Sequence, residues 1–333
     1  MIAVNVGPQQ ADGLLEKLFM LPYGRASLLF MFLAGIGLGL LTHPARKTPW
    51  REQWVLLVWR SLLLLVGGLG LQTINHGVSV ILTVYGVLFL AAIPLTRMGT
   101  RALAIATGAM AILGPLAWIA ILVARDEAFR GKPILLPATP IEVMDRIVIT
   151  GPYPALVWVV PLLAGLTLSR FDMASKRIQM RLLVGGFAAM IGGLLLSRML
   201  GALTGIDPTN EGYARLLASY DHSEAPLWLL SGVGSAACLV GLFCIIEPWL
   251  GRHAQALINL GRLSLTMYVV HLILIAVFVR PDPHTTIEGI AYAALISLFC
   301  LICAHLWVLH FGRGPLERLL RVPFPATRRP VSS

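Results

Sequence analysis

The sequence predicts an all-α protein, a polytopic bundle of transmembrane helices, and three observations support this prediction. Hydrophobic residues fill 57% of the 333 positions, against roughly 45–50% in a soluble domain. Charged residues fill only 13%, about half the usual share, which is too little to cover a soluble globule of this size. The apolar residues gather in stretches of around 20, the length of helix that crosses a hydrocarbon core about 30 Å thick. The same composition excludes disordered and collagen-like chains.

About nine stretches are apolar enough to be membrane spans, and the third and eighth are short. They cover residues 26–42, 53–72, 77–95, 102–124, 152–169, 182–203, 226–246, 263–279 and 288–309. The first residues, MIAVNVG, resemble the last turn of a preceding helix, so we expect ten spans in the complete protein. We treat residues 1–333 as a single integral membrane domain. It divides into N-terminal helices (1–124), an external loop (125–151), C-terminal helices (152–310) and a basic tail (311–333).

The orientation follows from the Lys and Arg residues of alternate loops, because cytoplasmic loops carry an excess of them. Sixteen fall on one side, which includes the tail, and eight on the other. The C-terminus is therefore expected in the cytoplasm and residues 1–22 outside. The net charge of +10 indicates this topology and predicts no nucleic-acid partner; the partner it predicts is the lipid bilayer.

Ionisable residues inside a span are candidate functional residues, because burying charge in lipid is expensive. Arg60 lies about two turns into the second stretch, and Arg198 lies near the outer end of the sixth. Either side chain could extend to the headgroups along its apolar stem. Otherwise it would face the bundle and bind a phosphate or carboxylate.

The eighth stretch carries one polar line, formed by Ser264, Tyr268 and His271 at helical spacing. Such groups turn inward in lipid. His271 is then either a hydrogen-bonded tie between helices or a neutral imidazole that acts as general base or proton relay.

Two histidines are expected at outer helix ends. His76 closes the second stretch, where it could cap the helix or act as a base. His222 stands between Asp221 and Ser223, whose side chains diverge from it and so form no triad. It belongs either to a solvated loop or to a base oriented by a distant carboxylate such as Asp207.

Other signatures of chemistry are missing from the sequence. The four cysteines, which include the pair Cys300 and Cys303, lie in apolar stretches and read as packing residues. There is no phosphate-binding glycine loop followed by Lys-Ser/Thr, no HExxH and no paired CxxC. We therefore expect no metal and no bound cofactor.

Five short segments carry a family resemblance. They are GRASLLFMFLAGIG (24–37), WRSLL (59–63), ILTVYG (81–86), residues 153–170 with their Trp158 and final Arg170, and GRLSLTMYVVH (261–271). In this order they resemble the YeiB-like family of bacterial multi-pass membrane proteins, a family of unknown function, over nearly the whole chain. The Asp that precedes the third segment in that family is Val80 here.

The YeiB-like family is distantly similar to the heparan-α-glucosaminide N-acetyltransferase group, which moves acetyl from cytoplasmic acetyl-CoA to a sugar amine across a membrane. The resemblance implies a bacterial cytoplasmic membrane protein, an acyl-CoA co-substrate and a glycan or lipid acceptor. Those acetyltransferases keep a His in the first outer loop, whereas residues 6–22 contain none. The base would then be His271, His76 or His222. The candidate substrate- and donor-binding residues are Arg60, Arg198, Tyr268, Ser264 and Tyr85.

Three functions stay open. We favour an acyltransferase that uses cytoplasmic acyl-CoA and an extracytoplasmic sugar, amine or alcohol. A small-solute transporter would use Arg60, Arg198 and His271 as substrate or proton sites. A non-catalytic envelope assembly factor, which could be a homodimer, would use the same residues for stability.

Overall fold

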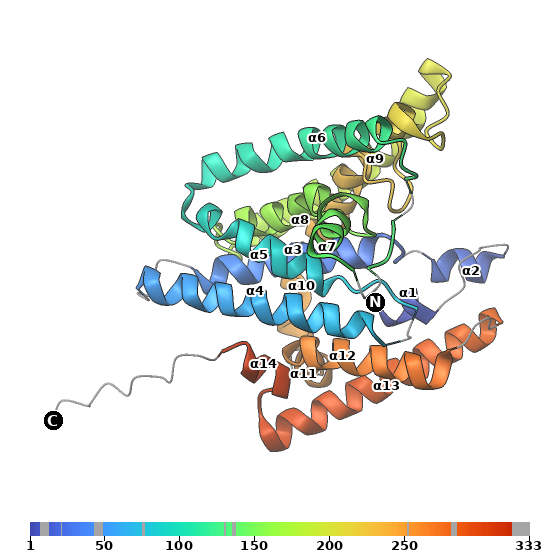
Figure 1. Ribbon diagram of the computed structural model, residues 1–333. Coiled ribbons are helices and arrows are strands. Elements are labelled where there is room, and N and C mark those ends of the chain that lie inside the picture. Colours follow the sequence, from blue (N-terminus) through green and yellow to red (C-terminus); the bar gives the residue numbers. More distant parts are fainter. Residues whose placement is uncertain are drawn as a thin grey trace.

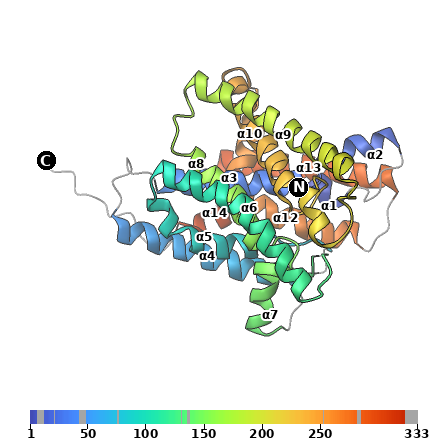
Figure 2. The same ribbon diagram turned by 90° about the horizontal axis from the view of Figure 1, so that it is seen from above.

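The computed structural model describes residues 1–6, 13–20, 22–42, 49–74, 77–129, 131–134, 138–251, 253–280 and 285–321, and every regular element in these ranges is helical. The α-helices are α1 (Ile2–Val6), α2 (Leu14–Phe19), α3 (Arg25–Leu41), α4 (Trp50–Gln72), α5 (Leu82–Ala92), α6 (Thr100–Ala124), α7 (Pro140–Asp145), α8 (Ala155–Leu168), α9 (Lys176–Thr204), α10 (Pro226–Leu250), α11 (Gln255–Arg262), α12 (Ser264–Leu274), α13 (Thr286–Phe311) and α14 (Pro315–Leu319). The 3₁₀ turns are η2 (Pro94–Arg97) and η4 (Gly212–Leu217), and the π-helical turns are η3 (Arg146–Thr150) and η5 (Ile275–Val279). Figures 1 and 2 show these helices gathered into one bundle.

Five helices, α4, α6, α9, α10 and α13, are long and apolar enough to cross a membrane. Two bent pairs raise the number to seven if each is one span: Pro140–Thr150 with Ala155–Leu168, bent by 61°, and Gln255–Arg262 with Ser264–Val279, bent by 85°. The apolar helices α3 and α5 are shorter. The described part of the chain is therefore an all-α, multi-pass membrane protein with five to seven candidate spans. Nine spans and the orientation stay predictions.

The third expected span, 77–95, is only partly helical. α5 begins at Leu82, because Gly77 takes a left-handed φ of 62° and residues 77–80 stay non-helical. Pro94 then starts the turn η2. An eight-residue helix, α11, lies where only an inner loop was expected.

The core is centred on the contact between α3 and α8, where two glycines let the backbones meet. A Cβ on Gly35 would lie 2.0 Å from the carbonyl oxygen of Leu162, and one on Gly165 would lie 1.9 Å from that of Phe32. No larger side chain fits at either position without moving a helix. The close approach of α3 and α8 therefore depends on these two glycines.

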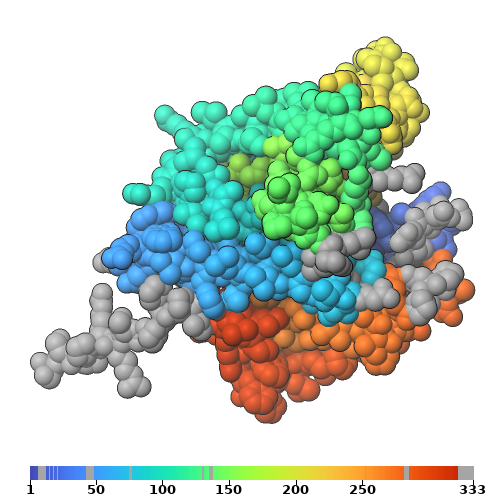
Figure 3. All heavy atoms as spheres, in the orientation of Figure 1, coloured from blue at the N-terminus to red at the C-terminus, as the bar shows by residue number. Residues whose placement is uncertain are grey.

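We call the two ends of the bundle inner and outer, after the orientation that the basic residues predict. The inner end carries the first turn of α4 and helix α14, towards the left of Figure 1, and the outer end carries the loop between α9 and α10 at the right. Figure 3 shows α14 and the end of α13, in red, lying against α4, in blue. Segments from the two halves of the sequence therefore meet at the inner end.

Candidate functional site

The outer end contains a strained segment, residues 219–225, which we call the His222 loop. It joins η4 to α10 and holds two non-glycine residues in the left-handed region, His222 at φ 56° and Glu224 at φ 57°. Each such residue costs about 1–3 kcal/mol and persists only where its surroundings fix it. The loop is therefore held by specific contacts.

Arg215 provides those contacts. Its Nε donates to the carbonyl oxygen of Ser223 at 2.7 Å, and its Nη2 donates to that of His222 at 2.8 Å. The side chain is buried, and its guanidinium carbon lies 5.2–5.7 Å from the ring centroids of Trp118, Phe129 and Tyr220. Arg215 thus binds two consecutive carbonyl groups and fixes the path of the loop.

The two left-handed turns bring His222 and Glu224 together. His222 Nδ1 lies 3.5 Å from Glu224 Oε1, with the imidazole side chain 40% exposed and the carboxylate side chain only 3% exposed. A carboxylate beside Nδ1 fixes the ring and leaves Nε2 on the opposite side. The carboxylate partner is therefore Glu224. Asp207 instead accepts from the backbone and hydroxyl of Thr209.

Three aromatic rings surround the imidazole. The ring centroids of Tyr153, Trp158 and Trp228 lie 5.8, 5.9 and 6.0 Å from that of His222. Around it, four buried polar atoms have no hydrogen-bond partner among the described residues: Ser223 Oγ, Glu224 Oε2, Trp158 Nε1 and Trp228 Nε1. Each such atom costs about 1–3 kcal/mol when it stays unsatisfied. The His222 site, made of the loop and these rings, can accordingly accept a polar ligand.

Asp221 adds a second carboxyl to this end. It packs against Gly24, whose φ is 63°, and the Arg25 guanidinium donates nearby to Ser231 Oγ at 3.2 Å. Burial raises the pKa of Asp221, and the charges of Arg25 and His222 partly oppose that shift. This part of the outer end therefore combines an imidazole, two carboxyls and two arginines.

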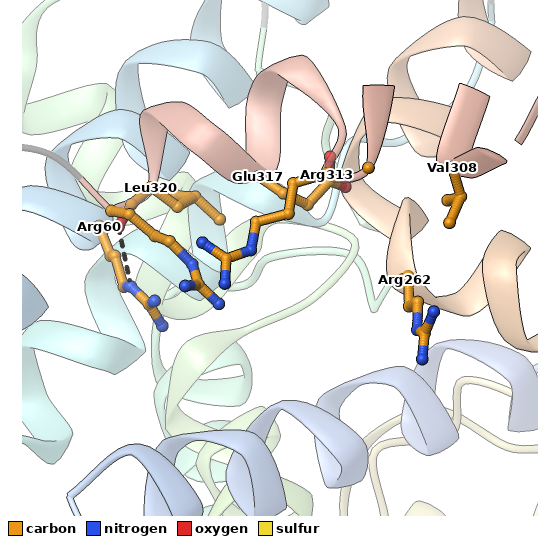
Figure 4. A pocket seen from close by; sticks show the side chains of 8 residues that line it. Arg60, Arg262, Val308, Arg313, Glu317 and Leu320 are labelled. Carbon is orange, nitrogen blue, oxygen red and sulfur yellow. Dashed lines mark hydrogen bonds between the residues drawn. The ribbon is translucent and has the colours of Figure 1, made fainter. Parts of the chain in front are cut away.

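The inner end holds a cavity of about 490 Å³, which we call the arginine pocket. It is lined by Arg60, Arg262, Val308, Gly312, Arg313, Glu317, Leu320 and Arg321. Figure 4 shows Arg60 and Arg262 on opposite sides of it, with the hydrogen bond from Arg60 Nε to the Leu320 carbonyl, 3.0 Å long, as a dashed line. Glu317 is the only carboxylate in this lining. It accepts from the backbone N–H of Thr266 at 2.9 Å and from its hydroxyl at 2.5 Å.

A second inner cavity, the Trp50 pocket, has a volume of about 430 Å³. It is lined by Thr42, Trp50, Gln53, Thr96, Arg97, Met98, Gly99, Thr100 and Arg170. Arg97 lies over the Trp50 ring at 5.0 Å, and Arg170 donates to the Thr96 carbonyl. The pocket also faces the first residue of α6, where backbone N–H groups favour anions.

His271 is fully buried between helices. Its Nδ1 lies 3.3 Å from the carbonyl oxygen of Met267 and its Nε2 lies 3.1 Å from Asn5 Nδ2 on α1. Nδ1 therefore carries the proton and Nε2 accepts from the amide. This geometry favours the tie between helices, and a role as base stays a prediction.

Two other predicted residues, Tyr268 and Tyr85, interact electrostatically with each other and with Tyr153 of the His222 site. Tyr268 and Tyr85 are buried in the core, but Ser264 is exposed, so the expectation that it turns inward is wrong. Arg198 is exposed on α9 and lines neither inner pocket. His76 lies outside the described residues.

The described candidate residues do not all lie together. Arg60 lies at the inner end, whereas Tyr268 interacts electrostatically with Tyr153 of the His222 site and its ring centroid lies 5.1 Å from that of His271. Sequence reasoning missed Arg215 and Glu224, which looked like charges of a solvated loop. It also missed Glu317, which follows Gly314 and Pro315 in a segment predicted as tail. A Gly-Pro pair ahead of an acidic residue is a helix-start signal and could have indicated α14.

No curated protein and no solved structure matches the chain. One family match exists, to the family described as "Protein of unknown function (DUF418)", over residues 170–323. This interval contains the His222 loop and Arg262, Arg313 and Glu317 of the arginine pocket, whereas Arg60 and the aromatic residues Tyr153 and Trp158 precede it. The match itself carries no activity. Residues 170–323 of this multi-pass membrane protein are thus similar to the DUF418 family.

Proposed function

We propose that the chain is a membrane acyltransferase in which His222 is the general base at the outer end. The observation that supports this is the pairing of His222 with Glu224 inside the aromatic His222 site. A general base needs a fixed ring, an orienting partner and access to the acceptor. His222 combines all three, because its ring is held from Nδ1 and is still 40% exposed.

The reaction is acyl transfer from a thioester to a hydroxyl or amine. His222 Nε2 takes the proton of the acceptor while the acceptor oxygen or nitrogen bonds to the acyl carbon. The bond between that carbon and sulfur then breaks, and the leaving thiolate takes the proton from the imidazolium. The unpartnered Ser223 Oγ, Trp158 Nε1 and Trp228 Nε1 supply hydrogen bonds to a polar acceptor such as a sugar.

The donor is a cytoplasmic acyl-CoA, and the Trp50 pocket suits its phosphates. Two guanidinium groups, hydroxyls and the N-terminus of α6 line this pocket. α8 runs from Trp158 at the His222 site to the neighbourhood of Arg170, about 18 Å at 1.5 Å per residue. Leu162, Leu163 and Leu166 of α8 are buried between the two sites. α8 and the helices that pack on it must therefore separate when the donor extends from the Trp50 pocket toward His222.

The experiment uses the full chain in nanodiscs, acetyl-CoA and longer acyl-CoAs, and glucosamine as the probe acceptor. Thiol release and donor binding are measured separately. We expect His222→Gln to reduce thiol release about 10²–10⁴-fold, the usual contribution of a general base, without weakening donor binding. Arg97→Gln should weaken binding of coenzyme A.

Two folded variants serve as controls. His271→Gln removes the buried imidazole of the tie between α12 and α1, and Arg198→Gln removes an exposed arginine that does not line the Trp50 pocket; both should keep wild-type kinetics. If release is lost in His271→Gln and kept in His222→Gln, the base is His271 and the proposal is wrong. If folded wild-type protein releases no thiol from any acyl-CoA, acyl transfer from coenzyme A is excluded.

A further inference from the structure

We propose that the arginine pocket and the apolar groove beside it form one binding site for an anionic phospholipid. The groove, which we call the leucine groove, has a volume of about 390 Å³. It is lined by Leu63, Leu64, Val66, Gly67, Gly70, Leu71, Ile74, Leu82, Leu265, Val269, Leu316, Leu319 and Leu320. This proposal concerns neither the His222 site nor the Trp50 pocket, so it stands independently of the acyltransferase.

The two cavities are continuous at α14. Leu320 lines both of them. α14 is held in place from two sides, because Trp59 Nε1 donates to the Leu319 carbonyl at 2.8 Å and Glu317 binds Thr266 at the start of α12. A ligand that fills the arginine pocket therefore reaches the leucine groove at Leu320.

The groove leads away from the arginine pocket along the second half of α4. On this helix it is lined from Leu63 to Leu71, about 12 Å at 1.5 Å per residue, and it continues to Ile74 beyond the helix end. A lipid whose phosphate lies in the arginine pocket can therefore extend an acyl chain along the groove.

The charges select an anion. Four guanidinium groups line the pocket, and its single carboxylate, Glu317, is already bound to Thr266. Arginine binds phosphate oxygens through paired N–H groups. In a phospholipid the apolar chains begin close to the phosphate, whereas in acyl-CoA a polar arm with two amides separates them. A groove lined by apolar side chains directly beside the arginines therefore favours the phospholipid.

Two glycines keep the groove open. A Cβ added to Gly67 or Gly70 would meet nothing within 4 Å. A leucine at Gly70 would therefore fill the groove without displacing a neighbouring helix. Gly37 on α3 also has open space around it and does not line the groove, so Gly37→Leu is a matched control for the same change of side chain.

The test is native mass spectrometry of the full chain in detergent, with phosphatidylglycerol and phosphatidylcholine that carry identical chains. We expect wild type to retain phosphatidylglycerol preferentially. Arg262→Gln and Arg313→Gln should each reduce this preference about fivefold, the effect of one arginine near an anionic headgroup. The control Arg177→Gln removes an exposed arginine on α9 and should leave the preference for phosphatidylglycerol unchanged.

The groove is tested with the same lipids. Gly70→Leu should weaken retention of phosphatidylglycerol roughly threefold by removing packing contacts along the chain, and Gly37→Leu should not. Glycerol 3-phosphate, which has the phosphate without the chain, should not displace the lipid at equal concentration. Equal retention of the two lipids by wild type would overturn the proposal. The proposal would also be overturned if equimolar palmitoyl-CoA displaced phosphatidylglycerol from wild type but not from Arg262→Gln. The arginine pocket would then bind acyl-CoA.

Discussion

The carboxyl of Asp221 connects the stability of the outer end to pH. Burial raises its pKa from the ordinary value of 3.8, so the folded chain keeps this proton at a higher pH than the unfolded chain does. At low pH this bound proton therefore raises the free energy of unfolding. That contribution is lost as the pH rises from about 3.8 through the raised pKa of the folded state.

We therefore expect Asp221→Asn to flatten the pH dependence of unfolding in this window. The asparagine has no proton to lose, so the variant should gain stability relative to wild type as the pH rises toward neutrality. The measurement is the unfolding midpoint in detergent at a series of pH values. Asp126→Asn, at an exposed loop position, is the control. An unchanged slope in Asp221→Asn would contradict the role assigned to burial.

At the scale of residues, only part of the His222 site could be predicted. The sequence marked His222 as a candidate base that needs a carboxylate. It could not identify Glu224, because a partner two residues away requires two left-handed backbone angles, and the contacts of Arg215 that hold this loop are not visible in the sequence. The prediction that the polar line of α12 faces inward is correct for Tyr268 and His271. It is wrong for Ser264, which is exposed at the 85° bend before α12.

At the scale of elements, one carboxylate, that of Glu317, joins α14 to α12. Glu317 accepts from the third backbone N–H of α12, where the positive end of the helix dipole favours a negative charge. We expect Glu317→Gln to destabilise the inner end by about 2 kcal/mol, because a charge-assisted hydrogen bond is replaced by a neutral one. Hydrogen exchange at the first turn of α12 and in α14 should accelerate, with Glu52→Gln on α4 as the control. Unchanged exchange would show that α14 is held by α4 alone.

The long helices could be predicted well from the sequence, because an apolar stretch of sufficient length gives a clear signal. Eight of the nine expected spans coincide with helical segments to within several residues at each end. The exceptions arise where tertiary contacts decide. Residues 77–80, which begin with the left-handed Gly77, stay non-helical ahead of α5. α11 packs on α13, where its Asn259 binds His305.

At the scale of the whole molecule, the orientation in the membrane can be tested directly. We expect Asn210→Cys, in the loop before η4, to react with a membrane-impermeant maleimide in intact cells. Ala174→Cys, in the loop before α9, should react only after permeabilisation. The native cysteines lie within helices α10 and α13, and wild type measures their background. The opposite labelling pattern would invert the assignment of inner and outer ends.

The hydrogen bonds between α4 and α14 also impose an order on biosynthesis. Trp59 and Arg60 donate to carbonyl groups 260 residues further along the chain. At about 5–20 residues per second, translation leaves these two side chains waiting on the order of tens of seconds for their acceptors. Until then α4 presents an indole and a guanidinium that lack those acceptors. A chain that ends before α14 keeps these two donors without the carbonyl groups of Leu319 and Leu320.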